Sequence, residues 1–61
     1  MGKTVKTFNI GDYIVYDNPH EYWDEGNIID TGDGSYITIE SINGNKRTFF
    51  QSTDFKYLFI A

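Results

Sequence analysis

The chain has 61 residues, a formal net charge of −4 and no cysteine, so it encodes one small domain without disulfides. A single histidine also excludes a Cys/His zinc site, and no apolar run is long enough to cross a membrane. Eight Ile, two Val and six Thr against one Leu and one Ala favour strands over helices. We therefore expect a soluble, cytoplasmic, all-β protein that holds no metal or cofactor.

In chain order, a flexible N-terminal arm at 1–7 precedes a single domain at 8–61. A Gly-Asp turn leads into the first predicted strand, 13–17, whose alternation places Ile14 and Tyr16 inside and Tyr13 outside. Asn18-Pro19 ends this strand, because proline donates no backbone hydrogen bond. A long acidic loop is then predicted to run as far as Glu25.

Four further strands are predicted, at 26–30, 35–42, 46–51 and 56–60, with a turn or a single 3-10 turn at 52–55. The turn between the second and third strands contains Asp33-Gly34. A two-residue loop there would bury Asp30 opposite Ile37 without a partner, which would cost several kcal/mol. A four-residue loop at 31–34 is therefore preferred, and it pairs Ile28 with Ile37.

The dipeptide Asn43-Gly44 predicts a two-residue type I′ hairpin between the third and fourth strands. That register places Ile37 opposite Phe50 on the core face and leaves Phe49 on the outer face. It also sets Glu40 opposite Arg47 as a cross-strand ion pair. The predicted core is Ile10, Ile14, Tyr16, Ile28, Ile37, Ile39, Phe50, Phe55, Leu58 and Ile60.

The spacing of turn and apolar residues resembles that of a known fold family. The pattern is Phe8-x-Ile10-Gly11-Asp12-x-Ile14-x-Tyr16, then Gly26-x-Ile28, then Gly34-x-Tyr36-Ile37-x-Ile39, Phe50 and Phe55-x-x-Leu58. It resembles the rhythm of Tudor-like and KOW-like domains. The resemblance implies a five-stranded SH3-like barrel with a long acidic loop after the first strand and a short 3-10 turn before the last strand. A five-stranded OB-like barrel is the alternative fold.

Catalytic chemistry finds little support in the chain. His20 is the only imidazole and follows Pro19 in a loop, and no cysteine is available as a nucleophile. The carboxylates of Asp24 and Glu25 face opposite ways in an extended segment. We therefore predict a non-enzymatic protein.

Charge and aromatic residues indicate a binding surface instead. Eight acidic residues and no Lys or Arg lie between Asp12 and Glu40, a distribution that favours a basic partner. The predicted function is a protein-interaction module for a basic or nucleic-acid-binding protein, with Trp23 as the hydrophobic anchor. There are two structural alternatives. The net negative charge serves only solubility, or Trp23 folds over one end of the barrel as a second small core. The predicted partner-binding residues are Asp17, Glu21, Tyr22, Trp23, Asp24, Glu25, Tyr36 and Phe49.

The Tudor-like resemblance also implies an aromatic cage for methylated Lys or Arg, with Tyr16, Tyr22, Trp23, Tyr36 and Asp24 as candidates. Another function is left open by the KOW-like resemblance. It is a small nucleic-acid-binding protein that uses Lys46, Arg47 and Lys56, with Phe49 as a stacking platform. A third is a subunit that adds an edge strand to a larger assembly, whereas the isolated chain is expected to be a monomer or a weak homo-oligomer. The size and the Ile/Asn/Asp-rich composition also fit a phage-encoded protein that modulates a host protein.

Overall fold

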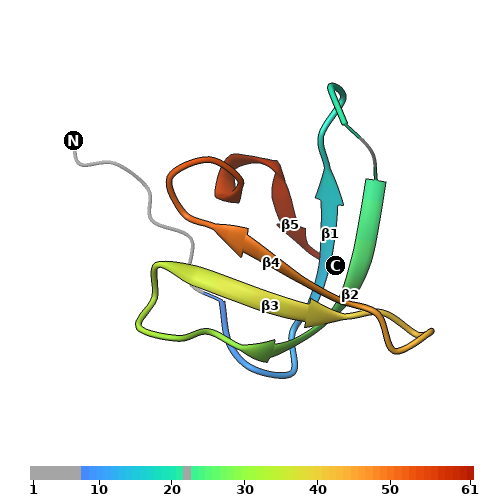
Figure 1. Ribbon diagram of the computed structural model, residues 1–61, viewed down its shortest axis with the longest axis vertical. Helices are drawn as coiled ribbons and strands as arrows, with labels where there is room; N and C mark the ends of the chain where they lie inside the picture. Colours follow the sequence, from blue (N-terminus) through green and yellow to red (C-terminus); the bar gives the residue numbers. More distant parts are fainter. Residues whose placement is uncertain (1–7, 22) are drawn as a thin grey trace.

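A computed structural model describes residues 8–21 and 23–61, and it contains five antiparallel strands in one sheet (Figure 1). The all-β prediction is confirmed, whereas the predicted arm at 1–7 lies outside the described residues. Within the described part of the chain, no helix has the length and apolar character to cross a membrane. The elements are β1 (Tyr13–Asp17), β2 (Trp23–Asp30), β3 (Tyr36–Glu40), β4 (Lys46–Phe50), the 3-10 helix η1 (Phe55–Tyr57) and β5 (Leu58–Ile60).

The strands follow the spatial order β4-β3-β2-β1-β5, so the first four form a meander and β5 returns to the free side of β1. The sheet is strongly curled. Tyr16 of β1 and Phe49 of β4 stack with ring centroids 4.4 Å apart, although β2 and β3 lie between their strands in the sheet. In a flat sheet the same two strands would be about 14 Å apart, at about 4.8 Å per strand. The inner face therefore wraps around the core.

Strand β2 begins three residues earlier than predicted. Trp23 pairs with Asp17, and the ladder with β1 continues to Asn27. The expected long acidic loop up to Glu25 is wrong in this respect, because Trp23, Asp24 and Glu25 belong to β2. Pairing with β3 starts at Asn27, so β2 leaves β1 and bends to run beside β3 (Figure 1).

Gly26 occupies the point where β2 passes from one neighbour to the other. A Cβ atom built there would lie 2.5 Å from the carbonyl oxygen of Glu40 and 3.1 Å from the backbone nitrogen of Ser41. Only glycine allows two backbones to approach this closely. This contact brings the start of the β3–β4 turn against β2.

The β3–β4 hairpin differs from the predicted register by one residue. Gly44 N–H donates to the Ser41 carbonyl at 2.9 Å, and Ser41 N–H donates to the Asn45 carbonyl at 2.8 Å, which leaves three residues in the loop. Gly44 has a φ of 87°, and no residue other than glycine has a positive φ in the described segments. A type I′ turn needs positive φ at both central residues, so Asn43 does not meet its requirement.

This one-residue shift exchanges the two faces of β4. Phe49 lies opposite Ile37 and is 1% exposed, whereas Phe50, which was predicted to be core, is 53% exposed. Lys46 rather than Arg47 lies opposite Glu40, so the predicted pairing of Glu40 with Arg47 is also wrong.

The β2–β3 pairing differs from its predicted register by two residues. Ile28 lies opposite Ile39 instead of Ile37, and the register shifts between Ile28 and Asp30. A displacement by an even number keeps side chains on their predicted faces. Ile28 is accordingly buried and Ile29 exposed, as expected.

Most of the predicted core is confirmed, with Ile14, Tyr16, Ile28, Ile37, Ile39 and Leu58 buried and Phe55 packed against them. Ile10 is 67% exposed because it lies in a turn, in which Asp12 N–H donates to the Asn9 carbonyl. Ile60 ends β5, an edge strand, and is also exposed. Phe8 takes the place that Ile10 was expected to fill, with its ring 5.1 Å from Phe55 in a T-shaped contact.

Candidate partner-binding site

A cavity of about 210 Å³ opens where β2 begins, between this strand and the β3–β4 turn. We call it the outer cavity. Two aromatic and two acidic residues form one part of its wall, and the hairpin turn forms the rest. The lining residues are Tyr13, Trp23, Asp24, Glu25, Ser41, Ile42 and Asn43.

The pairing of β1 with β2 gathers the first part of this wall. Asp17 lies opposite Trp23, and Val15 lies opposite Glu25. Because side chains alternate between faces, Trp23 and Glu25 share the outer face of the sheet with Tyr13. Trp23 is 57% exposed and Tyr13 is 39% exposed, so both rings are accessible to a partner.

The hairpin turn completes the wall from the other side. Ser41, Ile42 and Asn43 follow β3 directly, and the close approach of Gly26 to Glu40 and Ser41 brings this turn to the first half of β2. Ile42 is fully exposed and adds an aliphatic side chain beside the rings. The outer cavity therefore depends on the bend in β2.

The electrostatic character of the outer cavity is negative. Within residues 8–21 and 23–61, no residue that lines it is Lys or Arg. Desolvation first, then a hydrogen bond to Glu25 and the negative charges of Glu25 and Asp24, raise the pKa of the Tyr13 hydroxyl. The backbone N–H of Glu25 donates to the Asp24 carboxylate at 2.8 Å, which fixes that side chain near the start of β2.

Ser41 adds a polar group to the same wall. Its hydroxyl oxygen is covered from solvent and has no hydrogen-bond partner within residues 8–21 and 23–61. Buried polar groups in proteins normally find a partner, so this hydroxyl is an exception, and because solvent does not reach it, it is not among the groups that the cavity opens to a ligand.

Further apolar surface adjoins the outer face of β1. Phe59 of β5 lies opposite Val15, and its ring is about half exposed. An exposed apolar strip therefore crosses β5, β1 and the start of β2, with Asp17 and Glu25 beside it. Exposed aromatic surface bordered by charged residues is typical of protein-binding sites.

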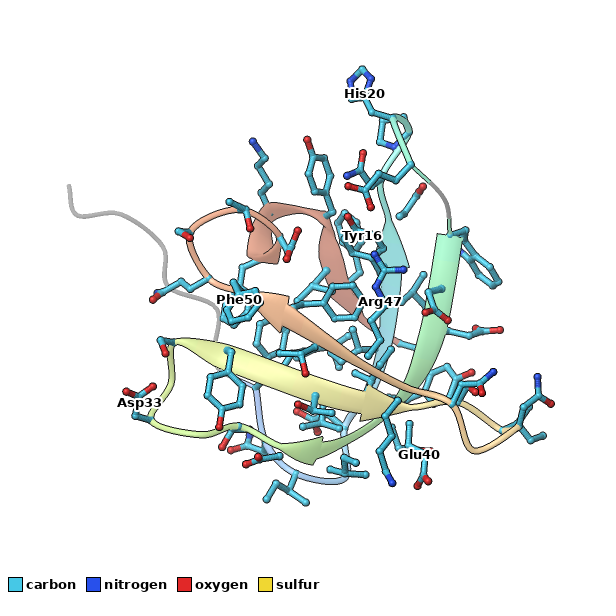
Figure 2. The ribbon with its side chains drawn as sticks, viewed as in Figure 1. Tyr16, His20, Asp33, Glu40, Arg47 and Phe50 are labelled. Carbon is cyan, nitrogen blue, oxygen red and sulfur yellow. The ribbon has the colours of Figure 1, made fainter. Side chains whose placement is uncertain are left out.

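A second cluster of rings and charged groups lies on the inner face, and it differs from the outer cavity because it contains its own cation, Arg47. We call it the arginine cluster; its members are Tyr16, Asn18, Glu21, Arg47 and Phe49. The Arg47 Cζ atom lies 5.2 Å from the centroid of the Tyr16 ring and 5.1 Å from that of Phe49. Its Nη2 atom donates to Glu21 Oε1 at 3.3 Å. Figure 2 shows Tyr16 and Arg47 close together at this end of the sheet.

Asn18 holds the arginine cluster together from the loop side. Its Nδ2 atom donates to the Tyr16 hydroxyl at 2.9 Å, and that hydroxyl donates to Glu21 at 3.3 Å. Asn18 Oδ1 accepts from the backbone N–H of His20, so the short loop after β1 is fixed by one amide side chain. The loop is therefore organised around the core and away from the outer cavity.

The structure brings together only part of the predicted partner-binding set. Asp17, Trp23, Asp24 and Glu25 lie together at the paired ends of β1 and β2. Glu21 instead contacts Tyr16 and Arg47 in the arginine cluster. Tyr22 lies outside the described residues.

Two predicted aromatic site residues lie elsewhere. Tyr36 is half-buried on β3, with its ring centroid 6.3 Å from that of Phe50. Phe49, expected on the surface, is buried in the core for the register reason given above. Tyr16, a candidate for the aromatic cage, is fully buried and stacks on Phe49, so its ring face is not open to a ligand.

Two of the three basic residues of the alternative nucleic-acid site contact aromatic rings of this chain. Arg47 belongs to the arginine cluster, and the Lys56 ammonium lies 5.2 Å from the centroid of the Tyr57 ring. The predicted stacking platform, Phe49, is covered by the core. The exposed ring on β4 is Phe50.

The sequence reasoning missed Tyr13 and the turn residues Ser41, Ile42 and Asn43 as parts of a site. The outward direction of Tyr13 was predicted, and its strand parity with Asp17 was available in the sequence. The pairing of β1 with 23–25 is what the sequence does not reveal, because the prediction places 23–25 in a loop. Ile42 was assigned to a strand, which concealed its place in the turn.

Comparisons with known proteins found no matching family model, no matching curated protein and no matching solved structure.

Proposed function

We propose that the protein is a non-enzymatic interaction module that binds a basic segment of another protein on the face formed by β5, β1 and the start of β2. The observation that carries this proposal is the outer cavity, where exposed rings and acidic residues meet and where none of the lining residues that the structure describes is basic. Trp23 is the anchor, and Asp17, Asp24 and Glu25 attract and orient the partner.

The distribution of charge supports a basic partner over a nucleic acid. Phosphates are bound by accessible Lys and Arg side chains, which are absent from the lining of the outer cavity. The carboxylates there would repel a phosphate backbone, and the same carboxylates accelerate encounter with a cationic chain. The predicted phage origin, host target and cytoplasmic location stay predictions that go with this function.

We also propose that the curled sheet is a small SH3-like barrel. Support comes from the five antiparallel strands, from the single 3-10 turn η1 before β5, and from the stacking of Tyr16 on Phe49 across the sheet. Such a fold supplies a rigid scaffold, but the binding role rests on the outer cavity alone.

The function is tested by titrating the protein with a short peptide rich in lysine and arginine. Trp23 is the only tryptophan in the chain, so intrinsic fluorescence reports on the proposed anchor directly. We expect the fluorescence to change on binding, and we expect affinity to fall as salt rises because exposed charges are screened. A peptide of equal length rich in glutamate is the control. An unchanged Trp23 signal with the basic peptide would exclude the proposed function.

A further inference from the structure

We propose that the outer cavity accepts an arginine side chain of the partner in preference to a lysine, with the guanidinium between the Trp23 and Tyr13 rings and the carboxylate of Glu25, and with Asp24 adding negative charge nearby. This inference rests on the proposed function and specifies which side chain of a basic segment occupies the cavity.

The size and lining of the outer cavity fit a large planar cation. Its volume of about 210 Å³ is several times the ~30 Å³ that one water occupies in the liquid, so it holds more than a small ion. Trp23 and Tyr13 offer aromatic faces, and Ile42 offers an aliphatic contact for the methylene groups of the incoming side chain.

The polar groups of the outer cavity have complementary chemistry. The Glu25 carboxylate accepts hydrogen bonds, Asp24 adds a negative charge that also acts on Tyr13, and guanidinium carries five N–H donors in a fixed planar fork. Lysine has a compact ammonium that is more strongly hydrated and neither stacks on a ring nor bonds a carboxylate in bidentate fashion.

The arginine cluster shows how the same combination of groups holds a guanidinium within this chain. Arg47 lies within 5.2 Å of two ring centroids and donates to a carboxylate, Glu21. The outer cavity repeats the rings and the acidic side chains, but the part of its lining that the structure describes contains no basic residue. A partner's arginine would supply the missing component.

The test compares three versions of one basic peptide, in which the cations are all arginine, all lysine, or arginine with a single central residue replaced by neutral citrulline. Dissociation constants are measured by Trp23 fluorescence, and backbone amide shifts of 13, 23–25 and 41–43 locate the peptide. We expect the arginine peptide to bind about tenfold more tightly than the lysine peptide. The citrulline peptide keeps the shape of arginine without its charge, and we expect the central replacement to weaken binding to a similar degree.

Two variants separate the carboxylates of the cavity from general charge. The double variant Asp24→Asn with Glu25→Gln is expected to abolish the preference for arginine. The control is Asp33→Asn, which also removes one negative charge. Asp33 precedes β3, whereas Glu40 and the hairpin turn lie at the other end of that strand (Figure 2). The control variant is expected to keep the preference. Folding of each variant is checked by its amide spectrum, and the peptide comparison on the unaltered protein needs no variant.

The outcomes distinguish a failure of the arginine preference from a failure of the proposed interaction function. Equal affinity for the arginine and lysine peptides, with a Trp23 response to both, overturns the inference and leaves the interaction function standing. No response to any basic peptide overturns both. A preference for arginine that survives the Asp24 and Glu25 substitutions, or amide shifts away from the outer cavity, overturns the inference.

Discussion

The arginine cluster and the outer cavity are built from the same kinds of group and differ in which molecule supplies the cation. In the arginine cluster, Arg47 of β4 lies over the stacked rings of Tyr16 and Phe49, and Glu21, from the loop 26 residues earlier, accepts hydrogen bonds from Arg47 and from the Tyr16 hydroxyl. In the outer cavity the rings stay exposed and the carboxylates have no basic neighbour in the lining. The first arrangement stabilises the fold, and the second leaves binding energy for a partner.

The comparison also shows that the exposure of a side chain, and not its residue type, decides whether it stabilises the fold or is open to a partner. Phe49 and Phe50 are identical neighbours, yet one is core and the other is surface. Substitutions in the arginine cluster should therefore change mainly the free energy of unfolding, and substitutions in the outer cavity should change mainly the affinity for a basic peptide.

The largest expected effect is on the core side of this comparison. Phe49→Ala removes a fully buried ring that stacks on Tyr16, and we expect the free energy of unfolding to fall by about 3–5 kcal/mol. Urea denaturation measures the change, and Phe49→Leu provides a milder variant should the alanine variant not fold. Phe50→Ala is the matched control, with an expected loss below about 1 kcal/mol. Equal losses at the two positions would contradict the observed register.

Gly26→Ala tests the contact on which the outer cavity depends. The added Cβ meets the carbonyl oxygen of Glu40, so either β2 or the β3–β4 turn must move. We expect a loss of about 1–3 kcal/mol in stability, together with weaker binding of the basic peptide because the wall of the outer cavity shifts. Gly34→Ala is a control of a different kind, because its Cβ meets nothing within 4 Å and its cost comes from a φ of 100° alone. Loss of peptide binding in the Gly34 variant, with retention in the Gly26 variant, would break the proposed link.

Arg47→Lys tests whether a guanidinium is required inside the chain. Lysine keeps the charge near Glu21 but loses the planar group over Tyr16 and Phe49, and we expect a loss of about 1 kcal/mol. The Arg47 and Glu21 side chains are 26% and 50% exposed, so solvent screening makes the ion pair itself a small part of this value. Thermal denaturation at low and high salt separates the two contributions. A loss that disappears entirely at high salt would show that charge rather than stacking holds Arg47 in place.

Trp23→Ala is expected to reverse the pattern seen at Phe49. The indole is more than half exposed, so we expect a change in stability of about 0.5 kcal/mol or less and a loss of peptide binding of at least about tenfold. Calorimetry measures the binding, because the variant has no tryptophan to report by fluorescence. A large loss of stability with unchanged affinity would identify Trp23 as a second small core and contradict the proposed anchor.

The smallest effect concerns the proton of Tyr13. Glu25→Gln removes a negative charge and alters the hydrogen bond to the phenol, and we expect the Tyr13 pKa to fall toward its ordinary value. A raised pKa in the folded state favours the neutral phenol. Its stabilising contribution is therefore present below the ordinary tyrosine pKa and is lost as pH rises through the raised value. An NMR titration of the Tyr13 ring measures the change, with Asp33→Asn as the control. An unaltered Tyr13 pKa would show that Glu25 does not face the cavity as described.

Local chemistry in the sequence was sufficient for the first strand and for the inner residues of three strands. Alternation placed Ile14 and Tyr16 inside β1, and the β2–β3 error of two residues left Ile28, Ile37 and Ile39 buried, since an even shift preserves the faces. The hairpin at Asn43-Gly44 shows the limit of this reasoning. The dipeptide suits a two-residue turn as well as a three-residue loop. The difference of one residue in loop length decides the face of every side chain on β4.

Composition and residue order alone determined that this protein is all-β, that it carries five strands, and that acidic residues gather between Asp12 and Glu40. Only the tertiary structure decided which rings are available, because burial depends on the register between strands and on the curling that stacks Tyr16 on Phe49. It also decided that Trp23, Glu25 and Tyr13 share a cavity with the β3–β4 turn. That arrangement requires the bend of β2 at Gly26, a contact between residues distant in sequence that no local pattern encodes.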